Sequence, residues 1–296
     1  VDFGNFQDVT VIGCKFDTEN DPIKGWEISV GGQTKTTGED GCVGFSLTQA
    51  GNYDITEETR SGWTPASATG YNFDAFSGGE YGPFNFVNFE NTTVQLCKVD
   101  AEGDPVEGWK VYLNDKEKTT DARGCASYEI TQPGEYIATE ESRPDWTALG
   151  ETSYKFFAES DGSYGPYVFT NFQHAKITGY KFNDLDGDGV WDDGEPPIEN
   201  WLISLDKKAD GGEYSPVVNK RTTAEGYYEF VLENPGNYRV TEEMPSGWTA
   251  TLPLSRSYEN LIPTSGEEIR KDFGNFQYGE LKVCKYTDYT GNGEYE

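Results

Sequence analysis

The sequence predicts an all-β protein built as a tandem array of small immunoglobulin-like (prealbumin-like) β-sandwiches. The first observation is a repeat, because Cys, Trp and Asn positions recur 83 residues apart, as in Cys14/Cys97 and Asn88/Asn171. The second is composition, since 19 Tyr, 17 Phe and 7 Trp accompany 35 Gly, which is typical of strands joined by tight turns. The third is periodicity, because apolar residues alternate along short runs and no long helical pattern occurs.

The repeat divides the chain into three complete modules and two partial ones. Modules one and two align without a gap, whereas module three carries insertions. We expect the chain to be a segment of a longer array. The expected parts are a closing strand of a preceding module at 1–7, module one at 8–90, module two at 91–174, module three at 175–278, and the opening strand of a following module at 279–296.

Each module places a lysine, a glutamate and an asparagine on inward faces of three different strands. In module one the opening strand alternates from Val9, so that Lys15 faces inward, and Glu57 and Asn88 share faces with Tyr, Ile and Phe side chains. The three expected sets are Lys15, Glu57 and Asn88; Lys98, Glu140 and Asn171; and Lys181, Glu242 and Asn275.

These three residue types are costly to bury unless they serve one another. Desolvation lowers the pKa of a lysine and raises that of a glutamate. A neutral amine can then attack the Asn carboxamide while a protonated Glu carries protons, giving an isopeptide bond and ammonia. Two alternatives stay open from the residues alone: a buried Lys–Glu ion pair with Asn as its hydrogen-bond partner, and a lysine whose ammonium reaches solvent.

The layout resembles the B-type repeat domains of Gram-positive collagen-binding adhesins and pilins. The resemblance lies in an opening-strand Lys, a closing-strand Asn and a Tyr-x-Leu-x-Glu strand followed by Pro-x-Gly-aromatic. Residues 53–57 and 238–248 fit that pattern. The resemblance implies a prealbumin-like sandwich with self-forming Lys–Asn isopeptides and a catalytic Glu. Module three also resembles the calcium-binding B repeats of Sdr-type surface proteins, which generally lack the crosslink.

An acidic loop follows the opening strand of module three. Its oxygen-bearing residues fall at positions 1, 3, 5, 9 and 12, with Gly189 at position 6, which is the spacing of an EF-hand calcium loop. The expected Ca²⁺ ligands are Asp184, Asp186, Asp188, the Val190 carbonyl, Asp192 and Glu195. A solvated acidic turn is the alternative. Residues 288–296 resemble the start of a second such loop, and modules one and two should bind no ion at this place.

Cysteines occur in pairs in modules one and two and are replaced together in module three. The expected disulfides are Cys14–Cys42 and Cys97–Cys125, and the module-three residues at both equivalent positions are Tyr180 and Tyr227. Zinc would need four ligands, whereas each module offers two cysteines. Disulfides indicate an extracellular setting. Cys284 would pair beyond this chain, and Asn91 begins a glycosylation sequon.

Charge and composition limit the classes of function that the chain can have. The net charge of −29 argues against nucleic-acid partners, and one histidine argues against His-based catalysis. No apolar run is long enough for a membrane span. We expect a non-enzymatic, extracellular stalk or filament at a cell surface, whose partners are neighbouring modules and other copies of itself. The alternatives are an adhesin that binds a ligand near residues 64–83, through Tyr71 and Tyr81, and a spacer in a secreted enzyme.

Overall fold

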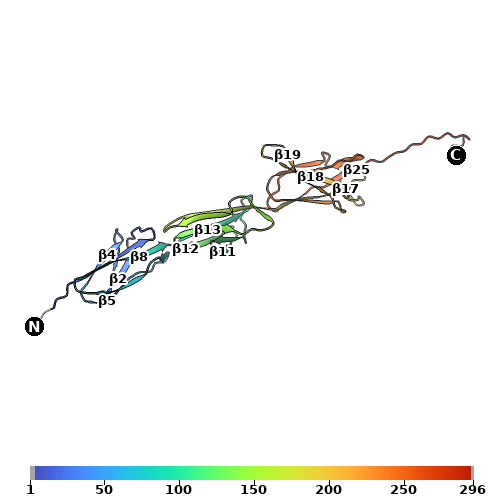
Figure 1. The fold of residues 1–296 in the computed structure, drawn as a ribbon. Helices are drawn as coiled ribbons and strands as arrows, with labels where there is room; N and C mark the ends of the chain where they lie inside the picture. The colour runs from blue at the N-terminus through green and yellow to red at the C-terminus, as the bar shows by residue number, and fades with distance from the viewer. Residues whose placement is uncertain (1–3, 295–296) are drawn as a thin grey trace. The chain divides into compact units, whose positions relative to one another are not determined.

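Three β-sandwiches follow one another along the chain (Figure 1). The structure, a computed structural model, describes residues 4–294. Within this range every regular element is a strand, which confirms the predicted all-β fold, and there is no helix that could cross a membrane. The chain divides into two compact units, one reaching to Arg143 and including Ala148–Asn171, and one made of Pro144–Thr147 with the residues from Phe172 onward.

Module one consists of two four-stranded sheets, in the orders β4-β1-β8-β6 and β3-β2-β5-β7. In the first sheet β1 and β8, the first and last strands, are parallel neighbours, and β1 pairs with β4 antiparallel on its other side. The strands are β1 Val9–Asp17, β2 Glu27–Val30, β3 Gln33–Thr36, β4 Cys42–Leu47, β5 Gly51–Glu57, β6 Trp63–Pro65, β7 Gly70–Ala75 and β8 Glu80–Glu90.

Module two repeats this topology, with sheets β12-β9-β16-β14 and β11-β10-β13-β15. Its first and last strands, β9 and β16, are again parallel neighbours. The strands are β9 Thr92–Val99, β10 Lys110–Leu113, β11 Lys116–Thr119, β12 Cys125–Ile130, β13 Gly134–Glu140, β14 Trp146–Ala148, β15 Ser153–Ala158 and β16 Tyr164–Gln173.

Module three has the same plan, but its closing strand is divided. The sheets are β20-β17-β25-β22, with β24 also paired to β17, and β19-β18-β21-β23. The strands are β17 Ala175–Asn183, β18 Leu202–Lys208, β19 Tyr214–Arg221, β20 Tyr227–Leu232, β21 Asn237–Glu242, β22 Trp248–Leu252, β23 Ser257–Leu261, β24 Glu268–Arg270 and β25 Phe273–Gln277.

The core of module one lies between its two sheets and follows the predicted alternation. Val9 and Val11 on β1 face Ile28 and Ile55 from the opposite sheet, and all four are fully buried. Phe86 on β8 completes this cluster. The inward parity that the sequence predicts for the opening, middle and closing strands is therefore confirmed.

The segment before β8 and the two ends of the described chain show features that the sequence does not predict. The segment 64–83 contains two further strands, β6 and β7, which form one edge of each sheet. Residues 4–8 and 278–294 form no strand, because no neighbouring strand pairs with them within the described chain. Residues 1–3 of the expected closing strand and 295–296 of the expected opening strand lie outside the described residues.

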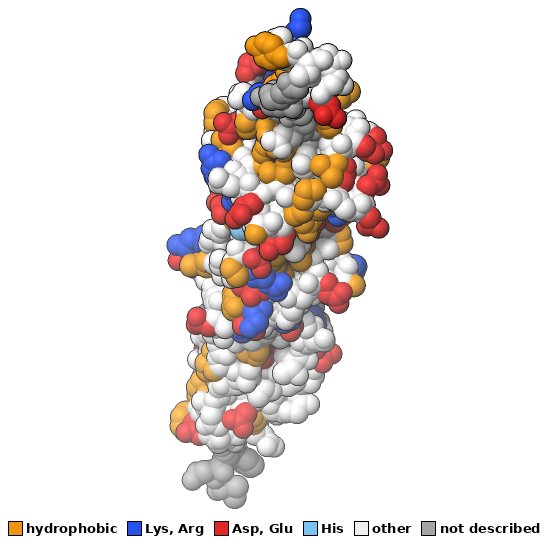
Figure 2. Space-filling view, turned by 90° about the vertical axis from the view of Figure 1, so that its right-hand side faces the viewer, with side chains coloured by type: hydrophobic (Ala, Val, Ile, Leu, Met, Phe, Trp, Pro, Cys, Tyr) orange, Lys and Arg blue, Asp and Glu red, His pale blue; other side chains and the backbone are white. Residues whose placement is uncertain are grey.

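The surface reflects the acidic composition. The sequence contains 52 Asp and Glu residues against 23 Lys and Arg. Carboxylates occur along the whole of the face in view, with fewer basic side chains among them (Figure 2). The excess of acidic over basic residues suits a solvated exterior and argues against nucleic-acid partners.

Candidate functional site: a buried Lys–Glu–Asn set in each module and an acidic loop

Neighbouring strands bring the lysine and the asparagine of each module together. In module one Lys15 of β1 lies opposite Phe86 of β8, and Asn88 is two residues further along β8, so both side chains enter the core from the same sheet. Glu57 ends β5 and enters from the opposite sheet. The sandwich therefore assembles the predicted residues from its first, fifth and last strands.

The lysines are fully buried and each lies against its glutamate. The distances from Lys Nζ to Glu Oε2 are 2.9 Å for Lys15–Glu57, 2.9 Å for Lys98–Glu140 and 3.3 Å for Lys181–Glu242. All three lysines are 0% exposed. The alternative in which the ammonium reaches solvent is therefore wrong, because the head groups of these three lysines are all buried.

The asparagines complete the sets. Asn275 Nδ2 donates to Glu242 Oε2 at 3.0 Å, and Asn171 Nδ2 lies 3.5 Å from Glu140 Oε2. The carboxamide oxygens of Asn88, Asn171 and Asn275 have no hydrogen-bond partner among the described residues. Rotation of a carboxamide by half a turn would bring this oxygen to the glutamate, where a protonated carboxyl could donate to it. The geometry fits both a buried ion pair and the reactants of an isopeptide bond.

Burial shifts the acid–base equilibria in the direction that the chemistry requires. Desolvation lowers the pKa of Lys15, although Glu57 opposes the change, and desolvation raises the pKa of Glu57 against the opposing effects of Lys15, Trp26 and Asn88. In module three desolvation lowers the pKa of Lys181 to about 8 and raises that of Glu242 to about 7. Proton exchange between Lys181 and Glu242 is therefore inexpensive near neutral pH.

A tryptophan ring lies against the lysine in each site. The repeat predicts the position of this tryptophan but not its contact with the lysine. Lys15 Nζ lies 4.6 Å from the Trp26 ring centroid, and the corresponding distances are 4.6 Å for Lys98–Trp109 and 4.8 Å for Lys181–Trp201. A cation over an indole face is stabilised by the ring quadrupole. The signal that could have identified these residues is their position in the same 83-residue register as the lysines.

Modules one and two also carry an arginine against this tryptophan. The guanidinium carbon of Arg60 lies 4.3 Å from the Trp26 ring centroid, and Arg60 donates to the Gly25 carbonyl. Arg143 repeats this arrangement on Trp109 at 4.3 Å. In module three the equivalent residue is Pro245, so this cation is absent there. The positive charge of Arg60 adds to desolvation in lowering the pKa of Lys15.

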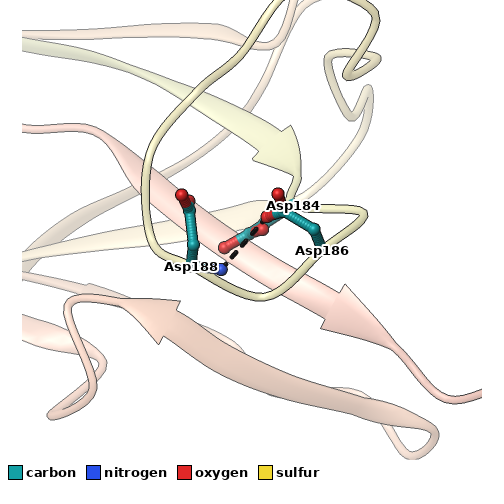
Figure 3. Close-up of side chains that lie close together, drawn as sticks. All are labelled: Asp184, Asp186 and Asp188. Carbon is teal, nitrogen blue, oxygen red and sulfur yellow. Dashed lines mark hydrogen bonds between the residues drawn. The ribbon is translucent and has the colours of Figure 1, made fainter.

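The acidic loop of module three brings three of its predicted ligands together (Figure 3). Asp184, Asp186 and Asp188 each offer a carboxylate oxygen, and these atoms lie within 4.8 Å of one another. Asp184 is fully buried, and burial raises its pKa, but the nearby Thr251 side chain and hydrogen bonds from the Gly187 and Gly189 N–H groups outweigh this effect and keep the pKa below its usual value. Three charged oxygens at this separation repel one another and suit a hard cation such as Ca²⁺.

The other predicted ligands lie outside that cluster. Glu195 accepts hydrogen bonds from the backbone N–H groups of Leu185 and Asp192, at 2.7 Å and 3.1 Å, so its carboxylate closes the loop. Asp192 is not part of the cluster, and Val190 donates its N–H to Asp188. Residues 288–293 repeat the turn, because Asp288 accepts from Gly291 and Gly293 as Asp184 does from Gly187 and Gly189.

The predicted disulfides are confirmed. Cys14–Cys42 and Cys97–Cys125 are both bonded, each closing a sequence separation of 28 residues. In module three Tyr180 and Tyr227 stand at the equivalent paired positions of β17 and β20, with ring centroids 5.3 Å apart. Cys284 is exposed and forms no disulfide with a described residue.

The structure also shows the contacts of the predicted glycosylation site and of the two tyrosines considered as ligand contacts. The sequon residue Asn91 accepts from Thr64 Oγ1 at 2.8 Å and donates to Glu129 at 3.3 Å, and its glycosylation stays a prediction. The Tyr71 and Tyr81 rings make tilted contacts with Phe84 and Phe73, with centroids 5.4 Å and 4.9 Å apart, and pack against the core of module one. These contacts explain both tyrosines without a ligand.

Comparison with known proteins finds similarity to staphylococcal surface-protein repeats. Residues 175–261 match the family model "SdrD B-like domain". This match covers most of module three. The chain as a whole is similar to serine-aspartate repeat-containing protein F of Staphylococcus epidermidis, with 25% identity over 80% of this chain and 17% of that protein. It is also similar to serine-aspartate repeat-containing protein D of Staphylococcus aureus strain MW2, with 26% identity over 86% of this chain and 22% of that protein.

Two solved structures align with most of the chain at low similarity. BcpA, the major pilin subunit of Bacillus cereus, aligns over 92% of this chain and 100% of that chain with a TM-score of 0.42 and 11% identity. The Bacillus anthracis TIE protein aligns over 92% of this chain and 51% of that chain with a TM-score of 0.40 and 18% identity. The chain spans about a fifth of the length of the curated relatives named above.

Proposed function

We propose that this chain is a load-bearing segment of a cell-surface stalk or filament, whose modules are each closed by a Lys–Asn isopeptide bond. The observation that carries the proposal is the buried Lys–Glu–Asn set, found three times between the first and last strands of a sandwich. A chain pulled at its ends loads those two strands first. A covalent bond between them would bypass the rest of the module. The role is structural rather than enzymatic.

The chemistry proposed for each set is a single-turnover condensation. The neutral lysine Nζ attacks the asparagine Cγ, the Cγ–Nδ2 bond breaks, and ammonia leaves. The glutamate supplies a proton to the carboxamide and takes one from the attacking amine, so no external reactant is needed. The burial that lowers the pKa of Lys15 and raises that of Glu57 favours these protonation states.

Calcium is proposed as the second stabilising element of module three. Asp184, Asp186 and Asp188 would hold the ion through carboxylate oxygens, with Glu195 closing the loop beside them. When bound, the ion would neutralise the repulsion among these carboxylates and so stabilise the loop.

Neighbouring modules are the proposed partners, together with other copies of the chain. Within the first compact unit Ser160 of module two contacts module one directly. Ser160 Oγ lies 3.1 Å from Thr18 Oγ1 and accepts from the Glu90 N–H at 3.1 Å, and the Ser160 N–H donates to Glu19 at 3.2 Å. These bonds support a junction that resists bending, as a stalk requires.

Single-molecule pulling under reducing conditions tests the load-bearing role. Residues 15–88 of module one would extend by roughly 25 nm if they unfolded freely. With the crosslink this extension is expected to be missing from the wild-type trace, and Glu57→Ala is expected to restore it. A wild-type trace that shows the full extension for every module would contradict the proposed function.

A further inference from the structure

A turn in each module binds a residue that lies just before the first strand of that module. In module one the turn connects β7 with β8, and it binds Gln7, two residues before β1. The Gln7 N–H donates to Ser77 Oγ at 2.8 Å, and the Gly78 N–H donates to the Gln7 carbonyl at 2.9 Å. Both polar groups of the Gln7 backbone are therefore bonded to one turn.

The same turn recurs at the two following junctions. Ser160 stands 83 residues after Ser77, and its Oγ accepts from the Glu90 N–H at 3.1 Å. In module three the Gly266 N–H donates to the Gln173 carbonyl at 3.0 Å. Each bonded pair lies within one compact unit. Glu90 and Gln173 are the last residues of β8 and β16, so these turns bind the end of the preceding module's closing strand. We call residues 77–78, 160–161 and 265–266 the clasps.

Two of the clasps pair a glutamine with a glycine. A Cβ at Gly78 would lie 2.8 Å from Gln7 Oε1, and a Cβ at Gly266 would lie 2.8 Å from Gln173 Oε1. Both glycines have a φ of 71°, which is the left-handed region that favours glycine. The glutamine side chain therefore lies where a larger turn residue would place its own side chain, and this pair of residues carries no charge.

The clasp between modules one and two pairs two acids instead. Asp161 stands at the glycine position with a φ of 57°, a conformation that aspartate tolerates better than most side chains. Glu90 stands at the glutamine position, 83 residues after Gln7. The two positions thus differ together from the other clasps, and the closed clasp brings two carboxylates to one place.

The other charged groups around Glu90 are also acidic. They are Asp17 at the end of β1, Glu19 in the loop that follows, and Glu129 on β12. Glu19 accepts from the Ser160 N–H at 3.2 Å, and β6 contributes the uncharged Trp63, which pairs with Glu90. No cation among the described residues offsets the effect of these acids on Glu90.

The closed clasp makes Glu90 harder to ionise. Burial raises the pKa of Glu90, and the charges of Asp161 and Asp17 raise it further. A carboxyl group with a raised pKa binds its proton more tightly in the closed clasp than in the open one. The closed state therefore gains stability as the pH falls toward the ordinary value of 4.5, and it loses that stability as the pH rises through the raised pKa.

We propose that the clasps join neighbouring modules, and that the Glu90–Asp161 pair makes the junction between modules one and two tighten on acidification. The partner of each clasp is the closing strand of the preceding module. The clasps that bind Gln7 and Gln173 lack this acidic pair. The inference develops the proposed contact between neighbouring modules, and it does not depend on the isopeptide bonds, which would lie inside the modules.

Hydrogen exchange of the full chain tests the clasp directly. The protection factors of the Glu90 and Ser160 N–H groups are measured between about pH 7 and pH 4.5, each corrected for the intrinsic exchange rate at that pH. Both are expected to rise on acidification, by up to about tenfold for each unit by which the clasp raises the pKa of Glu90. The Gln7 N–H, which donates to Ser77, is the internal control and should not change. Protection that is the same at both pH values would overturn the inference.

Three variants separate the acidic pair from the general stability of the turn. Glu90→Gln restores the residue of the other clasps, and it is expected to keep the protection high and independent of pH. Asp161→Asn retains a residue that tolerates a left-handed φ, and it should weaken the response. Glu129→Gln removes a nearby acid outside the clasp and should leave the response intact. A Glu90→Gln chain that still tightens on acidification would overturn the role of the pair.

A distance measurement extends the test to the junction itself. Genetically encoded spin labels at the exposed positions Thr48 and Asp115 report on modules one and two, and the distribution of their separation should narrow on acidification. Increased protection without this narrowing would confine the effect to the strand end and overturn the statement about the junction. The mass of the same samples reports the isopeptide bonds. A chain that lacks them but shows the pH response would reject the proposed crosslinks and keep this inference, whereas a crosslinked chain without the response would do the reverse.

Discussion

Modules one and three hold the same Lys–Glu–Asn set but stabilise it in different ways. Module one has the Cys14–Cys42 disulfide between β1 and β4, and Arg60 against its tryptophan. Module three has Tyr180 and Tyr227 at the cysteine positions, and no equivalent arginine. In their place it has the acidic loop, which contacts β17, β22 and β25. The comparison teaches that the buried set is constant, whereas the stabilising elements around it are interchangeable.

The largest expected effect comes from the shared set. Glu57→Ala would leave Lys15 buried without its carboxylate, which costs about 3–5 kcal/mol of module stability. The variant would also lose the crosslink, and closing a loop of this length contributes about 4 kcal/mol more. Hydrogen exchange of module one measures the change, with the exposed Glu39→Ala as a control within about 1 kcal/mol of wild type.

Glu242→Ala should destabilise module three to a similar extent, because Lys181 and Lys15 are equally buried. If only module one responded, the two sets would not be equivalent and the comparison would fail.

The second-largest expected effect is the loss of the disulfide, which module one has and module three lacks. Replacing Cys14 and Cys42 by serine removes a crosslink over 28 residues, and the expected loss of stability is about 3–4 kcal/mol for module one. Module three should not respond to a reducing agent, because no described disulfide lies within it. Thermal unfolding followed module by module, with and without reductant, checks this. A reductant effect on module three would show that the modules are coupled.

Calcium should stabilise module three and leave module one unchanged, which is the reverse of the disulfide effect. The expected change in stability is also smaller. A concentration one hundred times the Kd stabilises the binding module by about 2.7 kcal/mol. Only module three is expected to respond, and Asp188→Ala should abolish the response because it removes one of the three clustered carboxylates. Calorimetric titration measures the calcium affinity, and hydrogen exchange measures the stability of each module. An unchanged affinity in Asp188→Ala would contradict the site.

The rate of crosslinking in module three should depend on pH in both directions. The pKa of Lys181 is lowered to about 8, so below about pH 7 the neutral amine becomes scarcer by about tenfold per unit and the rate falls. The pKa of Glu242 is raised to about 7, so above about pH 8 the protonated acid becomes scarcer and the rate falls again. Refolding followed by mass at several pH values tests this. A rate that rises steadily with pH would show that Glu242 does not act as the proton donor.

The sequence predicts much of the fold because the repeat has a constant length in modules one and two and because side chains alternate regularly between the two faces of each strand. An 83-residue register aligns every core strand of two modules, and the period of two places Lys15, Glu57 and Asn88 inward without further information. The disulfides follow from the joint replacement of Cys14 and Cys42 in module three.

Other features depend on contacts between residues distant in sequence. β6 and β7 have weak strand patterns and are fixed by pairing with β8 and β5. Nothing local reveals that Trp26 lies beneath Lys15, since the two meet across the core. The closing strand divides into β24 and β25 where the backbone at Gly179 approaches the Lys271 carbonyl closely. Glu195 has the spacing of a calcium ligand, but its position in the loop is decided by backbone N–H groups.

The intact mass of the wild-type chain, fully reduced and unfolded, tests the central claim most directly. Three isopeptide bonds predict a mass below the sequence mass by three ammonia molecules when the chain has folded in calcium. Glu57→Ala is predicted to restore one of the three, apart from the mass of the substitution itself. A wild-type mass equal to that of the sequence would contradict the account and leave the buried Lys–Glu pairs as ion pairs.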